Sequence, residues 1–244
     1  MRLKFWFPVI VLLIAATPAA AAEPLTEDDV ADIVERTLRD KPELVLEAIE
    51  ELQRRDIAAT ERRVIAERAA EIFDDPAAPV GGNPQGDIAL VEFFDYRCGY
   101  CKRVHPVIEK LLAEDGNIRF VYKEFPILGP DSDYAARAAL ASRPQGKYQA
   151  FSDALMSARG NLDQARVHAI AAEVGLDLAE LKQTMTAQRT EIDKAIALNH
   201  DLARDLAING TPAFVLGETV VRGAVDYDTI KRLVAETRAK QQRQ

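Results

Sequence analysis

Two cysteines are the residues best suited to chemistry in this chain of 244 residues, and they are its only thiols. Cys98 and Cys101 lie one helical turn apart in the segment FFDYRCGYCKRVHP, residues 93–106. Two thiols at this spacing form a disulfide, bind a metal, or alternate between the dithiol and disulfide states. A purely structural bridge is disfavoured, because closing so short a loop removes little entropy from the unfolded chain. The C-x-x-C pattern therefore predicts a redox pair.

The surrounding sequence assigns the two cysteines different tasks. The apolar run IALVEFF, residues 88–94, predicts a buried strand, and the cysteine motif then opens a helix. Unpaired N–H groups and the helix dipole at that N-terminus favour a thiolate at Cys98, which we expect to be the nucleophile. Cys101, one turn further on and more buried, would resolve a mixed disulfide. Between them, Gly99 leaves the sulfur accessible to substrate and Tyr100 offers an aromatic face.

A metal site is the main alternative at this motif. Cys98, Cys101 and His105 share one helical face, with a C-x2-C-x3-H spacing that could hold copper or zinc. The other two histidines, His168 and His200, are isolated, so no second cluster completes the ligand set. We therefore predict no metal site and interpret His105 as a helix residue near the active site.

The N-terminus predicts export to the periplasm. Arg2 and Lys4 precede the apolar run FWFPVIVLLIAA, which gives way to the small residues TPAAAA. This order of charge, apolar core and small residues is typical of a secretory signal, here residues 1–22. An uncleaved membrane anchor is the alternative, but the apolar core is short for about 30 Å of hydrocarbon. No later stretch of the sequence is apolar enough to span a bilayer.

Charge and cysteine content exclude two classes of protein. Cleavage of the signal would remove two positive charges and take the formal net charge from −8 to −10. Such an acidic chain is a poor partner for nucleic acid, because phosphate binding needs clustered Lys and Arg. An exported chain with one cysteine pair is also not a disulfide-stapled scaffold. The pair is therefore expected to have a specific chemical task.

The mature chain divides into a helical extension, residues 23–78, and a larger domain, residues 79–244, with a Pro- and Gly-rich boundary at 74–87. The first predicted helix of the extension carries an apolar stripe formed by Val30, Ile33, Val34 and Leu38. This stripe packs either on the protein's own main domain or on other copies of the chain. Self-association is favoured, because so few helical residues bury little core alone.

Strands and helices alternate in the larger domain. The cysteine-bearing helix extends to about residue 114, and a second strand is predicted at 117–124. Helical patterns then fill residues from about 130 to 208, and a strand hairpin at 212–225 leads into a final helix from Asp226. A βαβ unit followed by a ββα unit predicts an α/β sheet with a helical insertion.

Three motifs in this order resemble the thioredoxin-fold thiol–disulfide oxidoreductases, and the helical insertion narrows the resemblance to their DsbA-like branch. The motifs are FFDYRCGYCKRVHP, KEFPILGPDSDYAARAA and GTPAF, within residues 83–233. The resemblance implies a thioredoxin-like fold, catalysis by Cys98 and Cys101, and no cofactor. It also implies that Thr211 and Pro212 form the family's cis-proline loop, which holds an extended substrate strand against the cysteines.

Glu92 lies inside the apolar strand, six residues before Cys98. In the DsbA-like pattern an acid at this place lies under the active site. A carboxyl group in that low dielectric has a raised pKa and could pass protons to or from Cys101. A glutamate on a solvated strand face is the alternative, since strand periodicity does not separate the two. Lys123, in the neighbouring strand, is its candidate charge partner.

The resemblance also bears on the direction of catalysis, which the reduction potential decides. The Gly-Tyr dipeptide within CGYC and the threonine before the proline resemble those of bacterial disulfide isomerases. The extension resembles that of the ScsC (suppressor of copper sensitivity C) group, some of which trimerise through it. An isomerase of this type would act on misfolded exported proteins and be kept reduced by a membrane thiol reductase of the DsbD or ScsB type. The charged segment 53–73 departs from a clean coiled coil, because Asp56 and Arg63 interrupt its apolar positions, so a homotrimer and a monomer both stay open.

Two further functions stay open at this point. A monomeric DsbA-like oxidase would oxidise unfolded proteins with free thiols and be recharged by a quinone-linked, DsbB-like membrane partner. A copper-binding stress protein would bind Cu(I) tightly and would lack activity on protein disulfides.

Overall fold

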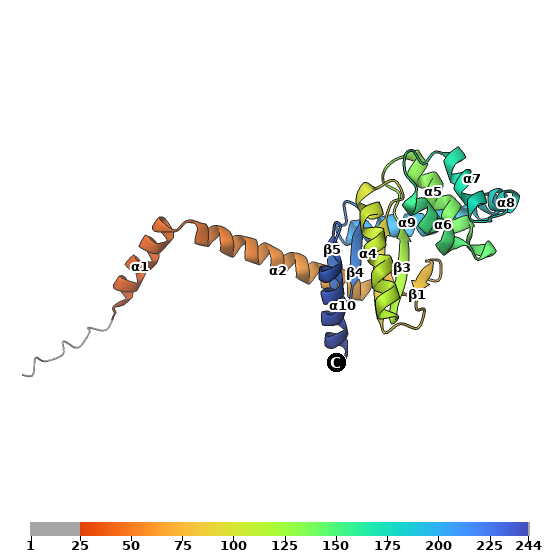
Figure 1. The fold of residues 1–244 in the computed structure, drawn as a ribbon. Coiled ribbons are helices and arrows are strands. Elements are labelled where there is room, and N and C mark those ends of the chain that lie inside the picture. The colour runs from red at the N-terminus through yellow and green to blue at the C-terminus, as the bar shows by residue number, and fades with distance from the viewer. Residues whose placement is uncertain (1–24, 244) are drawn as a thin grey trace, which may run out of the picture. The chain divides into compact units, whose positions relative to one another are not determined.

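The computed structural model describes residues 25–243 (Figure 1), so the predicted signal, residues 1–22, lies outside the described residues. The described chain falls into two compact units that divide between Gln53 and Arg54. The first unit holds helix α1 and the N-terminal part of α2, and the second holds the sheet and the other helices. Along residues 25–243, no helix combines the length and the apolar character needed to cross a membrane.

Helices make up most of both units. In chain order they are α1 (Glu27–Asp40), α2 (Glu43–Glu67), α3 (Ala69–Phe73), α4 (Gly99–Asp115), α5 (Pro130–Ala141), the 3₁₀ helix η1 (Arg143–Gln145), α6 (Tyr148–Ser157), α7 (Gln164–Glu173), α8 (Leu178–Ala187), α9 (Arg189–Asp205) and α10 (Tyr227–Gln241). The strands are β1 (Val80–Gly82), β2 (Ile88–Phe94), β3 (Ile118–Glu124), β4 (Ala213–Leu216) and β5 (Thr219–Arg222).

Side-chain caps fix several of the helix starts. Thr26 forms a capping box with Asp29 at the start of α1, and Asp177 accepts hydrogen bonds from two backbone N–H groups at the start of α8. Asp163 caps α7, because its carboxylate accepts a hydrogen bond from the N–H of Arg166 at 2.9 Å.

The five strands form one mixed sheet in the order β1-β3-β2-β4-β5. Strands β2 and β3 are parallel and joined by α4, while the other pairs are antiparallel. Helices α4 and α10 cover one face of the sheet, and α3 and α9 contact the other (Figure 1). Both central strands are therefore buried on two faces, which explains their nearly continuous apolar sequence. This arrangement, with α5–α9 inserted before β4, is a thioredoxin-like α/β fold.

Residues 54–78 belong to the unit that contains the sheet. Val64 and Ile65 of α2 and Ile72 of α3 lie in the same hydrophobic cluster as the inner strands. Glu61 also forms an ion pair of 2.7 Å with Arg222 of β5. The Pro- and Gly-rich boundary at 74–87 had predicted that these residues belong to the extension. Of the few apolar residues in this segment, Val64, Ile65 and Ile72 are buried against the sheet.

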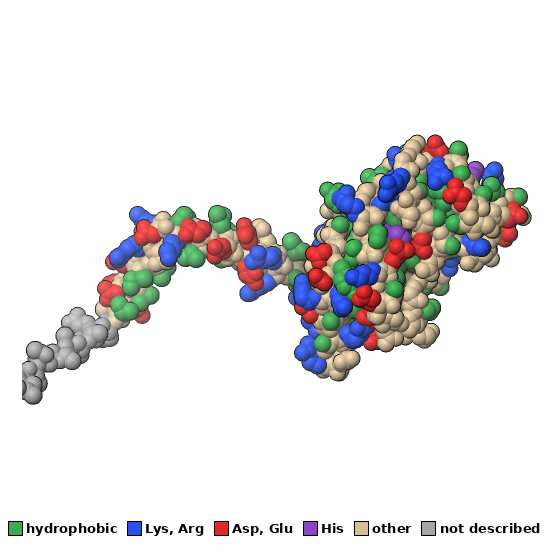
Figure 2. Space-filling model, viewed as in Figure 1, with side chains coloured by type: hydrophobic (Ala, Val, Ile, Leu, Met, Phe, Trp, Pro, Cys, Tyr) green, Lys and Arg blue, Asp and Glu red, His purple; other side chains and the backbone are tan. Residues whose placement is uncertain are grey.

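In the first unit, the apolar stripe of α1 is exposed to solvent. Its four residues expose between 44% and 50% of their surface, and α1 buries no residue. They are Val30, Ile33, Val34 and Leu38. The N-terminal part of α2 adds further exposed apolar residues, and Figure 2 shows hydrophobic side chains on the surface of both helices. An unpaired apolar surface of this kind is typical of a segment that packs on a partner.

Candidate active site

The two cysteines lie at the N-terminus of α4, shortly after the end of β2. Cys98 is the N-cap residue of the helix and Cys101 lies one turn inside it. Both are free thiols, and Cys101 is fully buried while Cys98 retains 7% of its surface. This gradient of burial agrees with an outer nucleophile and an inner resolving thiol.

The loop before β4 brings a second chain segment to the cysteines. The Thr211–Pro212 peptide bond is cis, as the resemblance implied. Because β4 pairs antiparallel with β2, with Ala213 opposite Phe93, the loop lies directly beside the end of β2. There the thiol of Cys98 donates a hydrogen bond of 3.2 Å to the carbonyl oxygen of Thr211.

Glu92 lies within β2, beneath the active-site helix, and exposes only 5% of its surface. The alternative of a solvated strand face is therefore wrong. Burial, with a smaller contribution from the nearby Cys98, raises the pKa of Glu92 to about 8. Burial also raises the pKa of Cys101, with Glu92 as the next contribution. The carboxyl group and the two sulfur atoms thus share one low-dielectric space.

Lys123 is not the charge partner of Glu92, so that expectation is wrong. In the parallel register, Glu92 pairs with Tyr122, whereas Lys123 pairs with Phe93 on the opposite face of the sheet. On that face the Lys123 ammonium group forms an ion pair of 3.0 Å with Asp75. Both side chains are buried, and the pKa of Lys123 is lowered by burial.

The two residues between the cysteines differ in environment. A side chain added at Gly99 would meet no neighbouring atom within 4 Å, so the surface above the motif is open. Tyr100 is 59% exposed, and the guanidinium group of Arg103 lies 4.1 Å from the centre of its ring. Tyr100 therefore presents an exposed aromatic ring beside the Cys98 thiol.

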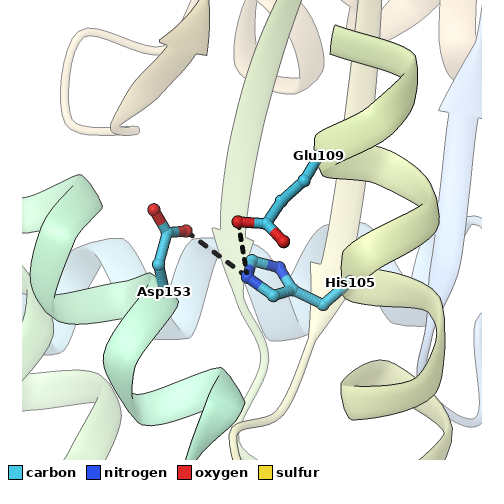
Figure 3. Close-up of side chains that lie close together, drawn as sticks. All are labelled: His105, Glu109 and Asp153. Atoms are coloured by element: carbon cyan, nitrogen blue, oxygen red, sulfur yellow. Dashed lines mark ion pairs between the residues drawn. The ribbon is translucent and has the colours of Figure 1, made fainter. Parts of the chain in front are cut away.

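His105 does not join the two cysteines in a ligand cluster. Its ring nitrogen instead groups with carboxylate oxygens of Glu109 and Asp153, all within 4.8 Å of one another (Figure 3). The spacing C-x2-C-x3-H places these side chains along one helix but not around one point. A copper or zinc site built on Cys98, Cys101 and His105 is therefore not supported.

Asp95 organises the turn that precedes Cys98, and sequence reasoning missed it. Its buried carboxylate accepts hydrogen bonds from the N–H of Arg97 at 2.7 Å and from the hydroxyl group of Ser132 at 2.8 Å. Its second oxygen accepts from the N–H groups of Ile127 and Leu128. One acid thus ties the cysteine loop to the start of the helical insertion. An aspartate directly after a buried strand was the available signal.

Lys102 makes a second link that the sequence did not indicate. Its ammonium group donates to the carbonyl oxygens of Leu155, Met156 and Ala158, at 3.0, 3.2 and 2.6 Å. These carbonyls lie at the C-terminus of α6, where unpaired acceptors favour a cation. The active-site helix is therefore anchored to the insertion as well as to the sheet.

Comparison with known proteins agrees with this fold. Residues 89–235 match the DSBA-like thioredoxin domain family. This match covers more than half of the chain, so the protein belongs to the DsbA-like thioredoxin domain family. Fold and family together support an oxidoreductase activity.

Three solved structures are similar to the chain. A thioredoxin-like oxidoreductase from Silicibacter pomeroyi is 47% identical, with a TM-score of 0.68, over 70% of this chain and 97% of that one. Proteus mirabilis ScsC in a transitional conformation is 32% identical, with a TM-score of 0.67, over 88% of this chain and 95% of that one. A periplasmic thioredoxin-like protein from Salmonella enterica serovar Typhimurium is 30% identical, with a TM-score of 0.64, over 70% of this chain and 95% of that one.

Similarity to curated proteins is confined to part of their length. The Na(+)/H(+) antiporter NhaA 1 of Salinispora arenicola is 28% identical over 157 residues, which is 64% of this chain. The chain spans only 24% of that antiporter's length.

Proposed function

We propose that the chain is an exported thiol–disulfide oxidoreductase of the ScsC type, which reduces or isomerises disulfides in misfolded periplasmic proteins. The observation that carries the proposal is the Cys98–Cys101 pair at the N-terminus of α4, with a buried carboxyl group beneath it and the Thr211 carbonyl beside it. The similarity to ScsC extends over most of the chain and supports this branch of the family. The periplasmic relative supports export.

In the first step, the Cys98 thiolate attacks one sulfur of a client disulfide. A bond forms between Cys98 Sγ and that sulfur, and the other client sulfur leaves as a thiolate, which takes up a proton from solvent. The backbone beside Thr211 and Pro212 is the proposed docking strand for the client. Gly99 and Tyr100 complete that surface, since the first is open and the second exposed.

In the second step, Cys101 resolves the mixed disulfide. Its thiol must lose a proton first, and burial opposes this loss by raising the pKa of Cys101. Glu92, with a pKa of about 8, is the proposed proton acceptor. Cys101 Sγ then bonds to Cys98 Sγ, and the client sulfur leaves as a thiolate. The client gains two electrons and the enzyme becomes a disulfide. During isomerisation, a client thiol displaces Cys98 instead and no net oxidation occurs.

A membrane thiol reductase of the DsbD or ScsB type is the proposed source of electrons that restore the dithiol. The exposed apolar residues of α1 and α2 are proposed to assemble a homotrimer. Several active sites around one client raise the effective concentration of thiols at its disulfides, which favours repeated rearrangement.

Reactivation of scrambled ribonuclease tests this function. The mature chain, residues 23–244, is compared with a truncation that begins at Arg54, because residues from Arg54 onward belong to the sheet-containing unit. An isomerase whose helices assemble its active sites is active in the mature form and loses most of that activity on truncation. The Cys98→Ser variant should be inactive in both forms.

The DsbA-like oxidase gives the opposite result in the same assay. Neither form would then reactivate scrambled ribonuclease, and both would oxidise the reduced enzyme efficiently. Activity that survives Cys98→Ser would contradict the redox mechanism itself. Tight, stoichiometric Cu(I) binding without any effect on protein disulfides would instead support the copper-binding function.

A further inference from the structure

A second cluster of chemically active side chains surrounds His105, which lies on α4 about one turn beyond Cys101. His105 and Glu109 project from α4 and Asp153 projects from α6, and Figure 3 shows the three side chains converging. They line a pocket of about 310 Å³ that also includes Tyr122 and Gln149. Neither cysteine lines this pocket, so the cluster is separate from the redox site.

The imidazole nitrogen of His105 lacks a hydrogen-bond partner. Its Nε2 atom is buried, and no donor or acceptor among residues 25–243 satisfies it. Glu109 and Asp153 are near, but Nε2 lies 3.7 Å from Glu109 Oε1 and 3.5 Å from Asp153 Oδ1. Both separations exceed the usual range of a charge-assisted hydrogen bond. A buried nitrogen without a hydrogen-bond partner destabilises the folded state, so the placement of this nitrogen between two carboxylate oxygens requires an explanation.

The same separations fit a shared metal ion. Zinc binds nitrogen and carboxylate oxygen at about 2.0–2.2 Å, so two ligands at a tetrahedral angle are about 3.4 Å apart. The two distances from His105 Nε2 are close to this value, and all three ligand atoms lie within 4.8 Å of one another. Small side-chain rotations would bring the three atoms around one ion.

The charges of the cluster also favour a cation. Glu109 and Asp153 place two carboxylate groups beside one imidazole, and Asp153 is part-buried. A divalent cation would offset both while His105 binds as a neutral ligand.

We propose that His105, Glu109 and Asp153 form a binding site for a divalent transition-metal ion of the zinc type. One imidazole and two carboxylates supply three ligands, and water would complete the tetrahedron. The nitrogen ligand selects against Mg²⁺ and Ca²⁺, which prefer oxygen ligands in larger numbers. The ion would join α4, which carries the cysteines, to α6 of the helical insertion. This site does not depend on the proposed redox function.

Zinc titration of a thiol-free protein tests the proposal. The chain from residue 23 carries Cys98→Ser and Cys101→Ser, because thiolates bind zinc themselves. Calorimetry and competition with a chromogenic chelator measure the stoichiometry and Kd, and Co²⁺ provides a visible absorption spectrum. Each variant is added to this background: Asp153→Asn, Glu109→Gln and, as a control, Glu218→Gln. Glu218 is an exposed acid in the turn between β4 and β5.

The expected result is one zinc ion per chain, with tetrahedral Co²⁺ bands. Loss of a ligand should weaken binding by at least about tenfold in the Asp153→Asn and Glu109→Gln variants, whereas Glu218→Gln should bind like the parent. The Glu109 side chain is 56% exposed, so its replacement leaves the core packing unchanged even where Asp153→Asn perturbs it. A parent that binds no zinc would overturn the proposal. Equal affinity of the Glu109→Gln and Glu218→Gln proteins would overturn it as well.

Discussion

Glu92, Cys98 and Cys101 share one buried space at the end of β2, and their charges oppose one another there. Cys98 raises the pKa of Glu92, and Glu92 raises the pKa of Cys101. A second negative charge in this space is therefore disfavoured, and the protonation of Glu92 is coupled to that of Cys101. Below pH 8 most Glu92 side chains are protonated, so the proposed transfer from Cys101 uses the ionised fraction, which grows when Cys98 loses its charge in a mixed disulfide. At the residue scale, the proposed mechanism depends on the carboxyl group of Glu92 as well as on the two sulfur atoms.

The Glu92→Gln variant should resolve mixed disulfides more slowly, because glutamine accepts no proton. We expect a loss of roughly a hundredfold, the lower end for proton transfer by a positioned side chain. Rapid-mixing kinetics with a model disulfide separates attack by Cys98, which should change less, from resolution by Cys101. Glu124→Gln is the matched control, since Glu124 is also buried with a pKa raised to about 8. Equal resolution rates in wild type and Glu92→Gln would remove the proton role.

The same substitution should change how stability depends on pH. The folded-state pKa of Glu92, about 8, lies above its ordinary value of 4.5, so the folded state retains a proton over that interval. Stability from the protonated group is present below pH 4.5 and is lost as the pH rises toward 8. Glu92→Gln does not titrate, so relative to wild type it should gain about 3 kcal/mol between pH 4 and pH 7. Urea unfolding at both pH values measures this gap, and a pH-independent gap would contradict it.

At the element scale, the sequence predicted most strands and helices, and it failed where tertiary contacts decide. The runs at 88–94 and 117–124 are apolar enough to identify central strands, and the structure confirms both within one residue. Strand β1 was missed, because its sequence VGG has no strand pattern and forms only by pairing with β3. Within the region from about 130 to 208 that was expected to be helical, α8 and α9 are separated at Gln188, where no proline or glycine marks a boundary.

For the site residues too, local sequence patterns identified some positions, and tertiary contacts decided the others. Local spacing was sufficient to find Cys98 and Cys101, while Glu92 and Pro212 came from resemblance. Periodicity did place Lys123 in a strand next to Glu92, but only the register shows that it lies on the opposite face. Its partner Asp75 is 48 residues away in sequence, in the segment 74–87 that was predicted to be a boundary between domains. No local pattern identifies such a pair.

The Lys123–Asp75 pair should fix the segment after α3 to the sheet. Asp75→Ala would leave the buried Lys123 ammonium group with only the carbonyl oxygen of Glu71, at 2.8 Å, as a partner. Removal of one member of a buried pair costs about 3–5 kcal/mol. Urea unfolding should show this loss, and the double variant Asp75→Ala/Lys123→Met should recover much of it, because no buried charge then remains. A single variant as stable as wild type would show that the pair contributes little.

At the scale of the whole molecule, the two units have opposite surface character. The unit from Arg54 onward buries its apolar residues in two clusters on either side of the sheet. The unit up to Gln53 leaves its apolar residues exposed over α1 and the N-terminal part of α2. The stripe therefore needs a partner to be stable, and a second and third copy of the chain would supply matching stripes. This is the physical basis of the proposed homotrimer.

Multi-angle light scattering on the mature chain tests this assembly, and we expect a mass three times that of one chain. Val34→Glu places a charge in the centre of the α1 stripe, where burial against other copies would cost several kcal/mol, so the assembly should dissociate. Arg36→Gln is the control, since it lies off the stripe and changes the net charge by the same amount. Dissociation should lower ribonuclease reactivation, while reaction of Cys98 with a small disulfide should not change. A wild-type monomer, or a Val34→Glu protein that keeps the wild-type mass, would contradict assembly through α1.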